Sequence, residues 1–402
     1  MNPYHRLLPL LAILWLAGCA TMAPHREIEG EVSAQKAQAE VPEGQLLDVW
    51  IEVFDPGELP EDSDEASGLS VDIREAEARY MAEHLRDTME QTGYWGAVRV
   101  VPRDTSGAEL LVRGTILASD GEQLKLRIQA RDASGREWLD GSYESEVTAA
   151  DYLSPERPQR DVFQSLYNAI ANDLARFRGD LSPDEIVTVR RIAALRFAAD
   201  LAPDAFGAYV RRNDAGEYRI LRLPALDDPM YRRVSAIRSR DFLLIDTLNG
   251  HFDNFSREVQ EPYTEWRRSR SEEAAALREI RSAATKRKLL GAMAILGAIA
   301  LEAAGSNSTR QATGGLRNAM WLGGAYAIKT GIDKDSETGI HRDAIEELGA
   351  SFASETRPLV VEVEGEVHEL NGSAEEQYAE WRALLKRIYQ SETGLAGAGE
   401  RD

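Results

Sequence analysis

Residues 109–147 read ELLVRGTILASDGEQLKLRIQARDASGREWLDGSYESEV, and this stretch decides the fold of the chain. Alternating apolar residues within it predict three consecutive strands, at 109–118, 123–132 and 138–147. The short segments that separate these strands contain Gly121 and Gly135 and are typical of hairpin turns. The stretch therefore predicts three neighbouring antiparallel strands.

Elements on both sides of this stretch complete a domain. Before it, the sequence predicts a strand, a helix and a second strand, at 47–54, 71–91 and 97–101. After it, apolar residues from Val162 to Phe177 recur at helical spacing. This order predicts an α+β fold over residues 45–180, in which helices cover one face of an N-terminal sheet.

A mainly helical region with a short β-hairpin is expected over residues 181–287. Its first helix begins at Ser182-Pro183-Asp184-Glu185, where Ser182 and Glu185 are spaced as a capping box. The hairpin is predicted within 208–223. A long helical stretch then runs from Asp228-Pro229 to Lys288, and Pro262 is expected to kink it or divide it in two.

Residues 288–332 predict an Ala/Gly-rich helical hairpin. Its first apolar run, Leu289–Leu301, has 13 uncharged residues, and its second is interrupted by Arg317 and Lys329. Small residues let helices approach closely, so the hairpin could pack in a membrane, as in a pore. A span needs about 20 apolar residues, however, and a run of about 10–14 is more typical of a packed helix. Soluble packing with self-association is therefore favoured over membrane contact.

The last part of the chain contains a repeated signature. Residues 333–393 predict a β-hairpin and a C-terminal helix, and residues 394–402 a disordered tail. Glu261-Pro262-Tyr263-Thr264-Glu265-Trp266-Arg267 returns as Glu376-Gln377-Tyr378-Ala379-Glu380-Trp381-Arg382, with five of seven positions identical. Tyr and Trp three positions apart lie on one helical face. They could form a docking face, but packing in the core is the preferred interpretation.

The first 18 residues have the pattern of a secretory signal. Arg6 precedes an apolar segment from Leu7 to Leu16, which is too short for a membrane span. The segment ends in Leu16-Ala17-Gly18-Cys19, which resembles the signal of bacterial lipoproteins. That resemblance implies cleavage before Cys19 and attachment of lipid to its sulfur. An ordinary signal peptide with a chance cysteine is the alternative, but Cys19 is the only cysteine in 402 residues.

The resemblance also implies a location. Ala20 behind the cysteine favours the outer membrane of the envelope, with the protein facing the periplasm and anchored by its lipid. Residues 19–44 lack hydrophobic periodicity and are expected to form a flexible tether. The net charge of −21 disfavours nucleic acid as a partner, because phosphate contacts require a basic surface.

Residues 46–178 resemble the α+β domain of a group of periplasmic lipoproteins. The residues that carry the likeness are Asp55-Pro56-Gly57, the helix around Tyr80-Met81-Ala82, and Trp95-Gly96-Ala97-Val98. The group includes the curli-secretion lipoprotein, the activator lipoproteins of penicillin-binding proteins, and the amino-terminal domain of the Tol beta-propeller protein. The resemblance implies binding to other envelope proteins or self-assembly, and it supplies no catalytic residues.

Motifs that would indicate an enzyme do not fit their surroundings. Ser33-Ala34-Gln35-Lys36 and Lys329-Thr330-Gly331 match two motifs of penicillin-binding enzymes, but they lie in the tether and in the Ala/Gly-rich hairpin. The histidines are widely separated. We therefore expect no catalytic residues, cofactor or metal site. The sequence predicts a non-catalytic structural or adaptor lipoprotein that binds envelope proteins and could form a homo-oligomer; a pore component and an envelope hydrolase are the alternatives.

Overall fold

The three strands predicted within 109–147 form the centre of a six-stranded sheet. The computed structural model describes residues 24–59, 70–154, 160–302, 343–347, 359–363 and 366–393, with side chains placed for all of these except 276–302 and 359–367. The strands are β1 (His25–Glu27), β2 (Val49–Glu52), β3 (Val98–Val101), β4 (Leu110–Ser119), β5 (Gln123–Asp132), β6 (Glu137–Glu146), β7 (Val210–Arg212), β8 (Tyr218–Ile220), β9 (Leu359–Val363) and β10 (Glu366–Leu370).

The helices follow the predicted order. They are α1 (Val71–Glu90), α2 (Ala149–Tyr152), α3 (Gln164–Gly179), α4 (Pro183–Leu201), α5 (Pro203–Phe206), α6 (Pro229–Glu302) and α8 (Ala374–Thr393), with a 3-10 turn at Glu43–Gln45. The capping box at the start of α4 is present, because Ser182 and Glu185 each bond the other's backbone. The predicted hairpins are present as β7–β8 and β9–β10.

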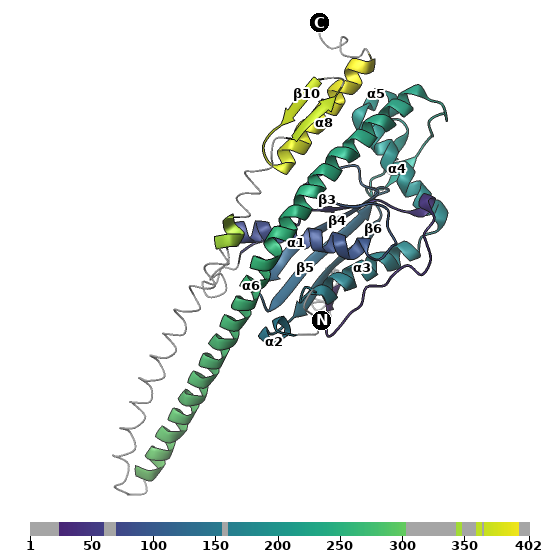
Figure 1. The fold of residues 1–402 in the computed structure, drawn as a ribbon. Coiled ribbons are helices and arrows are strands. Elements are labelled where there is room, and N and C mark those ends of the chain that lie inside the picture. The colour runs from purple at the N-terminus through teal and green to yellow at the C-terminus, as the bar shows by residue number, and fades with distance from the viewer. Residues whose placement is uncertain are drawn as a thin grey trace, which may run out of the picture.

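The sheet has the order β1-β6-β5-β4-β2-β3 and mixes parallel with antiparallel pairs. β4, β5 and β6 pair antiparallel, whereas β2 pairs parallel with both β3 and β4. Helices α1 and α3 cover one face (Figure 1), and the core lies between them and the sheet. The opposite face carries surface ion pairs such as Arg127–Asp140 and Lys125–Glu144. The predicted α+β fold is confirmed.

The predicted flexible tether is wrong for residues 24–44, which lie along the domain. β1 extends the sheet as a parallel neighbour of β6. Farther on, the amide of Val32 donates to Ser165, and Asn172 of α3 both accepts from the Gln35 amide and donates to the Ser33 carbonyl. This segment has no hydrophobic period because backbone hydrogen bonds, rather than an apolar face, fix it to the domain. Residues 19–23 lie outside the described residues.

Helix α6 is a single helix of 74 residues that includes Pro262, so the expectation that Pro262 could divide it in two is wrong. Its buried residues recur every three or four positions, and they include Ile237, Leu248, Phe255 and Trp266. This continuous packing offsets the hydrogen bond that proline removes. The helix runs along edge strand β3, where Asn249 accepts a hydrogen bond from the Val100 amide at 2.7 Å. Only the first apolar run of the predicted Ala/Gly-rich hairpin lies within it, since residues 303–342 are not described.

The aromatic pair of each copy of the repeated signature is buried, which confirms the core interpretation. Tyr263 and Trp266 are covered by the domain, and Tyr378 and Trp381 are buried where α8 packs on α6. The arginine that ends each copy reaches a buried aspartate: Arg267 pairs with Asp161, and Arg382 with Asp241.

Candidate functional site

The described surface is hollowed on two sides of the β7–β8 hairpin, which stands beside α4 at one end of the molecule (Figure 1). Tyr218 at the start of β8 lines both hollows. Its backbone amide donates to the Ser134 carbonyl at 2.7 Å, which holds the hairpin against the turn between β5 and β6. The hairpin therefore separates two adjacent candidate binding regions, which we call the groove and the cavity.

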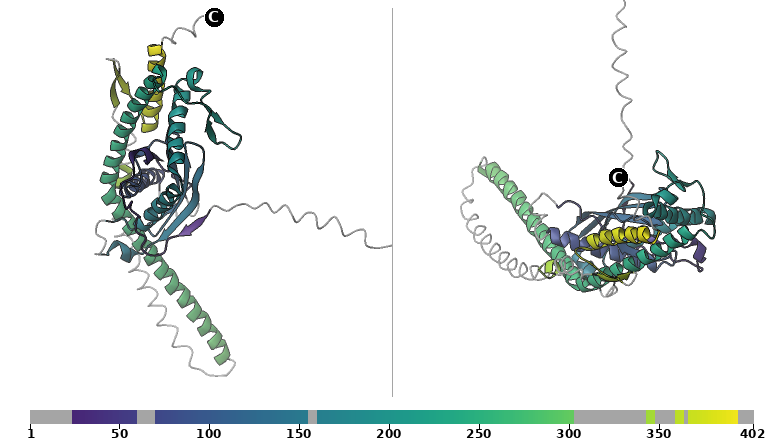
Figure 2. Two further views of the ribbon diagram at one scale, coloured as in Figure 1. Left: turned by 90° about the vertical axis from the view of Figure 1, so that its right-hand side faces the viewer. Right: turned by 90° about the horizontal axis from the view of Figure 1, so that it is seen from above.

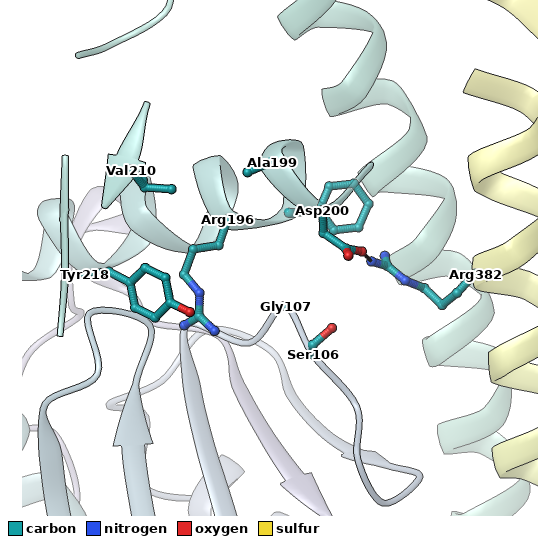
Figure 3. A pocket seen from close by; sticks show the side chains of 9 residues that line it. Ser106, Gly107, Arg196, Ala199, Asp200, Val210, Tyr218 and Arg382 are labelled. Carbon is teal, nitrogen blue, oxygen red and sulfur yellow. Dashed lines mark hydrogen bonds and ion pairs between the residues drawn. The ribbon is translucent and has the colours of Figure 1, made fainter. Parts of the chain in front are cut away.

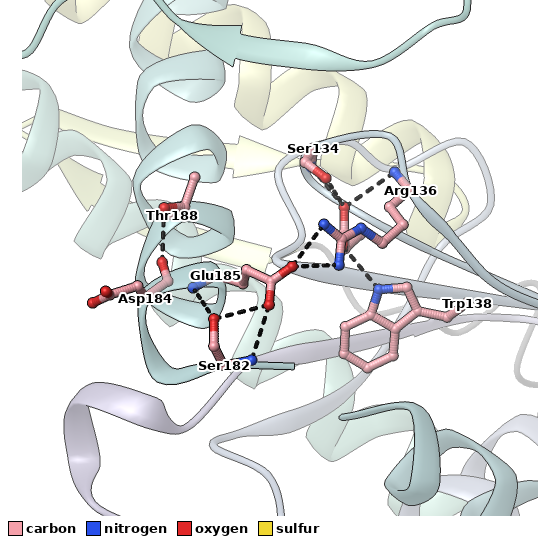
Figure 4. Close-up of polar contacts among 8 residues, drawn as sticks. Ser134, Arg136, Trp138, Ser182, Asp184, Glu185 and Thr188 are labelled. Atoms are coloured by element: carbon pink, nitrogen blue, oxygen red, sulfur yellow. Dashed lines mark hydrogen bonds and ion pairs between the residues drawn. The ribbon is translucent and has the colours of Figure 1, made fainter. Parts of the chain in front are cut away.

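The groove is an open depression of about 710 Å³ between α4 and the hairpin. Val189 and Ile192 of α4 and Ile220 of β8 give it an apolar lining. Arg136 and Glu185 form one rim of the groove, where Arg136 donates two hydrogen bonds of 3.0 Å to Glu185 (Figure 4). Hydrogen bonds from Ser182 and from Arg136 lower the pKa of Glu185 to about 2, so this rim is charged at neutral pH.

The segment after β8 extends the apolar lining of the groove onto the open surface. Its leucines 221, 223 and 226 are all exposed to solvent, and the Leu226 side chain is fully exposed. Arginines 211 and 212 of β7 and Arg222 of this segment have no carboxylate within 4.0 Å in the part of the chain that the structure describes. The hairpin therefore presents apolar and positively charged groups on a protein whose net charge is −21. Such a mixed patch is typical of a surface that contacts another molecule.

The cavity on the other side of Tyr218 has a volume of about 340 Å³. Arg196 and Asp200 of α4, Arg382 of α8 and Ser106 of the β3–β4 loop surround it (Figure 3). Arg382 donates to Asp200 at 2.7 Å and to Asp241 at 3.3 Å. Burial raises the pKa of Asp241 to about 6, against the opposing effect of Arg382.

A third set of polar groups lies inside the protein, between α1, α3 and α6. Glu77 accepts hydrogen bonds from Arg74, Ser119 and Tyr263, while Asp161 accepts from Arg267 and Tyr80. Glu77, Arg74, Tyr263 and Arg267 are all at least 97 % buried. These groups pair with one another and link the three helices, so we interpret them as part of the fold rather than as a ligand site. Among the described residues, the Nε atoms of Arg74 and Arg267 have no hydrogen-bond partner.

The residues of the lipid and enzyme motifs do not come together at these hollows, although Glu185 of the capping box lines the groove and Arg382 of the repeated signature lines the cavity. Cys19 lies outside the described residues. Ser33 and Lys36 lie on the segment along α3, where their carbonyls accept from Asn172 and Tyr94. His84 of α1 bonds Gln164 at 2.9 Å and stacks on the Tyr80 ring, so this half-buried histidine lies at the edge of the core and not at either hollow.

Sequence reasoning missed Arg196, Tyr218 and the pairing of Arg382 with Asp200. Arg196 and Asp200 are one helical turn apart on α4, but nothing in the sequence indicates that α8 reaches them. Within the described ranges, no group of three or more His, Cys, Asp or Glu side chains is arranged to hold a metal ion. No helix there is both long and apolar enough to cross a membrane.

Comparisons with protein-family models, with curated proteins and with solved structures found no match to this chain.

Proposed function

We propose that this protein is a non-catalytic structural or adaptor lipoprotein of the bacterial envelope that binds other envelope proteins. The signal ending at Cys19 supports the lipid anchor and the outer-membrane location. The likeness of residues 46–178 to domains of periplasmic lipoproteins supports the class of function. The course of α6 is the observation that carries the proposal.

Helix α6 joins the domain to a long projecting arm. Its first half is fixed by buried side chains up to Trp266 and Arg267, and Ser271 still bonds Glu122 of the β4–β5 turn. Residues 276–302 continue the helix beyond the domain (Figure 1) by about 40 Å, at about 1.5 Å per residue. We refer to residues 276–302 as the arm. A helix of this length is well suited to hold two contacts at a fixed separation.

The arm lies at one end of the molecule, and the β7–β8 hairpin with α4, whose residues line the groove, lies at the other (Figure 2). The groove offers an apolar lining and a charged rim to a partner segment. The end of the arm carries the apolar run Leu289–Leu301, which follows Lys286-Arg287-Lys288. This arrangement supports an adaptor that binds a partner at the groove while the arm joins a second copy or another component.

A membrane-inserting pore component is the second candidate. The specific observation in its favour is that α6 passes without a break from the basic triplet 286–288 into the apolar run. Basic residues next to an apolar helix are typical of membrane-surface segments. The run is shorter than the about 20 residues that a span requires, which favours self-association over a pore.

Cross-linking in living cells tests the adaptor proposal. Because Cys19 is the only cysteine and its sulfur is expected to carry lipid, an introduced cysteine would be the only free thiol. Leu223→Cys samples the groove, Ser282→Cys samples the arm, and Arg127→Cys on the open face of the sheet is the control. We expect the first two to give discrete products with a thiol-to-amine cross-linker, identified by mass spectrometry. Products no stronger than those of Arg127→Cys at both positions would contradict the proposal.

A further inference from the structure

We propose that the cavity beside Tyr218 binds a small ligand through an anionic oxygen group, a carboxylate or a phosphate, which pairs with Arg196. This site is separate from the groove that the adaptor proposal uses, because it lies on the other side of the hairpin.

The Arg196 side chain is held in place without any ligand. One of its terminal nitrogens, Nη1, donates to the Ala133 carbonyl at 2.8 Å. Its guanidinium carbon lies 4.1 Å from the centre of the Tyr218 ring (Figure 3), within the range of a cation–π contact. A group already fixed in its bound position loses little conformational entropy when a ligand arrives, which favours binding.

Arg196 forms no close ion pair within the part of the protein that the structure describes. No carboxylate lies within 4.0 Å of it among the described residues. Asp200 is engaged by Arg382 and Lys386 at 2.7 and 3.2 Å. Asp132, another nearby acid, accepts instead from Ser134 and the Trp138 indole. Burial lowers the pKa of Arg196 and outweighs the opposing effect of the more distant Asp132.

The remaining lining fits a small organic anion. Phe197, Ala199 and Val210 provide apolar surface, and Ser106 and Tyr218 provide hydroxyl groups. A volume of about 340 Å³ is at the small end of the range of ligand sites. The planar fork of a guanidinium matches the two oxygens of a carboxylate or phosphate. The chemistry therefore selects a compact anion with an apolar portion.

The loop that forms the opposite wall is fixed as well. Gly107 has a φ of +123°, and a Cβ atom there would lie 3.3 Å from the Trp50 ring. Asp104 in the same loop has a φ of +61°, in the left-handed region that few non-glycine residues adopt. The loop is thus pressed against the core, which keeps Ser106 at the cavity.

Isothermal titration calorimetry on the full chain, purified in a non-ionic detergent, tests the proposal. The probes are inorganic phosphate, N-acetyl-L-alanine as a carboxylate, and N-acetyl-L-alanine amide as the uncharged control. We expect saturable binding of at least one anion at millimolar concentration and none of the amide. Preference for phosphate would point to a phosphorylated ligand, and preference for N-acetyl-L-alanine to a carboxylate or a peptide carboxyl end.

Variants separate binding from folding. Arg196→Gln should weaken binding roughly tenfold or more, since a hydrogen bond to a charged group contributes about 1.5–3 kcal/mol. Arg196→Lys keeps the positive charge but lacks the planar guanidinium, and should lower the affinity by an intermediate amount. Ala199→Leu should block the cavity while leaving Arg196 in place. Arg211→Gln, an exposed arginine of the same hairpin outside the cavity, should bind as wild type does.

These measurements can support or overturn the proposal. Equal affinity of wild type, Arg196→Gln and Ala199→Leu would overturn it, as would the failure of both anions to bind wild type. If Arg196→Gln does not fold, as judged by thermal unfolding, Ala199→Leu still decides. The absence of anion binding at the cavity would not change the cross-linking expected from Leu223→Cys in the groove. The anion-site proposal and the adaptor proposal can therefore fail independently.

Discussion

Arg267 of α6 and Asp161, which precedes α3, form a buried bidentate ion pair, in which the guanidinium donates hydrogen bonds of 2.7 and 3.2 Å to the carboxylate. Each side chain is 2 % exposed. Burial alone would raise the pKa of Asp161, but the nearby Arg267 outweighs it and holds that pKa below its ordinary value. Asp161 also accepts from the Phe163 amide. The pair therefore joins the long helix to the α+β domain at a point from which water is excluded.

Breaking this pair should destabilise the protein strongly. We expect Arg267→Met to lower the free energy of unfolding by about 3–5 kcal/mol, because it leaves the Asp161 carboxylate buried without its partner. The double variant Arg267→Met with Asp161→Asn should recover part of this loss, since the asparagine is neutral and keeps an acceptor for the Phe163 amide. Urea unfolding followed by circular dichroism measures both.

The matched control is Arg268→Met, one residue farther along the same helix. Arg268 is about one-third exposed and pairs with Glu265, so its loss should cost less than about 1 kcal/mol. Similar losses for Arg267→Met and Arg268→Met would show that the buried pair contributes no more than a surface pair.

Glu83 predicts a pH dependence of stability. This residue of α1 is 1 % exposed, and its carboxylate lies 3.0 Å from the Arg86 guanidinium. Arg86 also lies within 4.0 Å of three other carboxylates, those of Asp87 and Glu90 on α1 and of Asp253 on α6. Burial raises the pKa of Glu83 to about 8, against the opposing effect of Arg86. The folded state therefore binds an extra proton between about pH 4.5 and pH 8, and the contribution of Glu83 to stability falls as the pH rises through that window.

Glu83→Gln should consequently be more stable than wild type at pH 8 to 9, by roughly 1–2 kcal/mol, and the gain should shrink toward pH 5. Thermal unfolding measures this as a Tm increase of about 2–4 °C for each kcal/mol. Glu258→Gln, an exposed glutamate on the facing helix, is the control and should follow the wild-type profile. A Glu83→Gln gain that does not vary with pH would show that Glu83 does not titrate in this range.

Most of the sheet could be predicted because its signals are local. Turn residues such as Gly121 and Gly135, both at positive φ, mark the ends of β4 and β5, and Ser182 with Glu185 marks the start of α4. The course of residues 24–44 could not be predicted, since this segment is held by Asn168 and Asn172, which lie more than 130 residues away in the sequence. Pro262 signals a break in sequence, but the burial of Tyr263 and Trp266 beside it keeps the helix whole.

The candidate cavity was beyond sequence reasoning for a related reason. Its groups come from the β3–β4 loop, α4, the β7–β8 hairpin and α8, and no spacing in the chain links Ser106, Arg196 and Arg382. The repeated signature did identify Arg382 and Arg267 as corresponding residues. Their aspartates, Asp241 and Asp161, belong to different elements, so the repeat could not reveal them.

The lipid anchor is predicted to depend on Cys19 alone. Without its sulfur there is no site for the lipid, so Cys19→Ser expressed in the native host should release the protein from membranes into the soluble envelope fraction. Fractionation followed by immunoblotting measures this, and Ser33→Ala, in the segment along α3, is a control that should remain with membranes. A Cys19→Ser protein that fractionates like wild type would mean that another contact retains it.

The end of the arm is predicted to drive self-association. The α6 backbone carries the run Leu289–Leu301 away from the domain. An apolar helix in this position can bury its surface by packing on another helix. Small residues in and after this run would let two such helices approach closely; they are Gly291, Ala294, Ala298, Gly323 and Gly324. A chain that begins after Cys19 should therefore form oligomers in detergent-free buffer, as measured by sedimentation velocity.

Gly297→Leu should weaken those oligomers by forcing the helices apart, although leucine is the better helix former. Gly250→Leu provides the matched control, because a Cβ atom at Gly250 would meet nothing within 4 Å and the same gain in helix propensity occurs there. The control should leave the oligomers intact, so a difference between the two variants isolates contact at the arm. A clean monomer before any substitution would overturn self-association. Leakage from liposomes on adding the unlipidated chain would instead favour the pore.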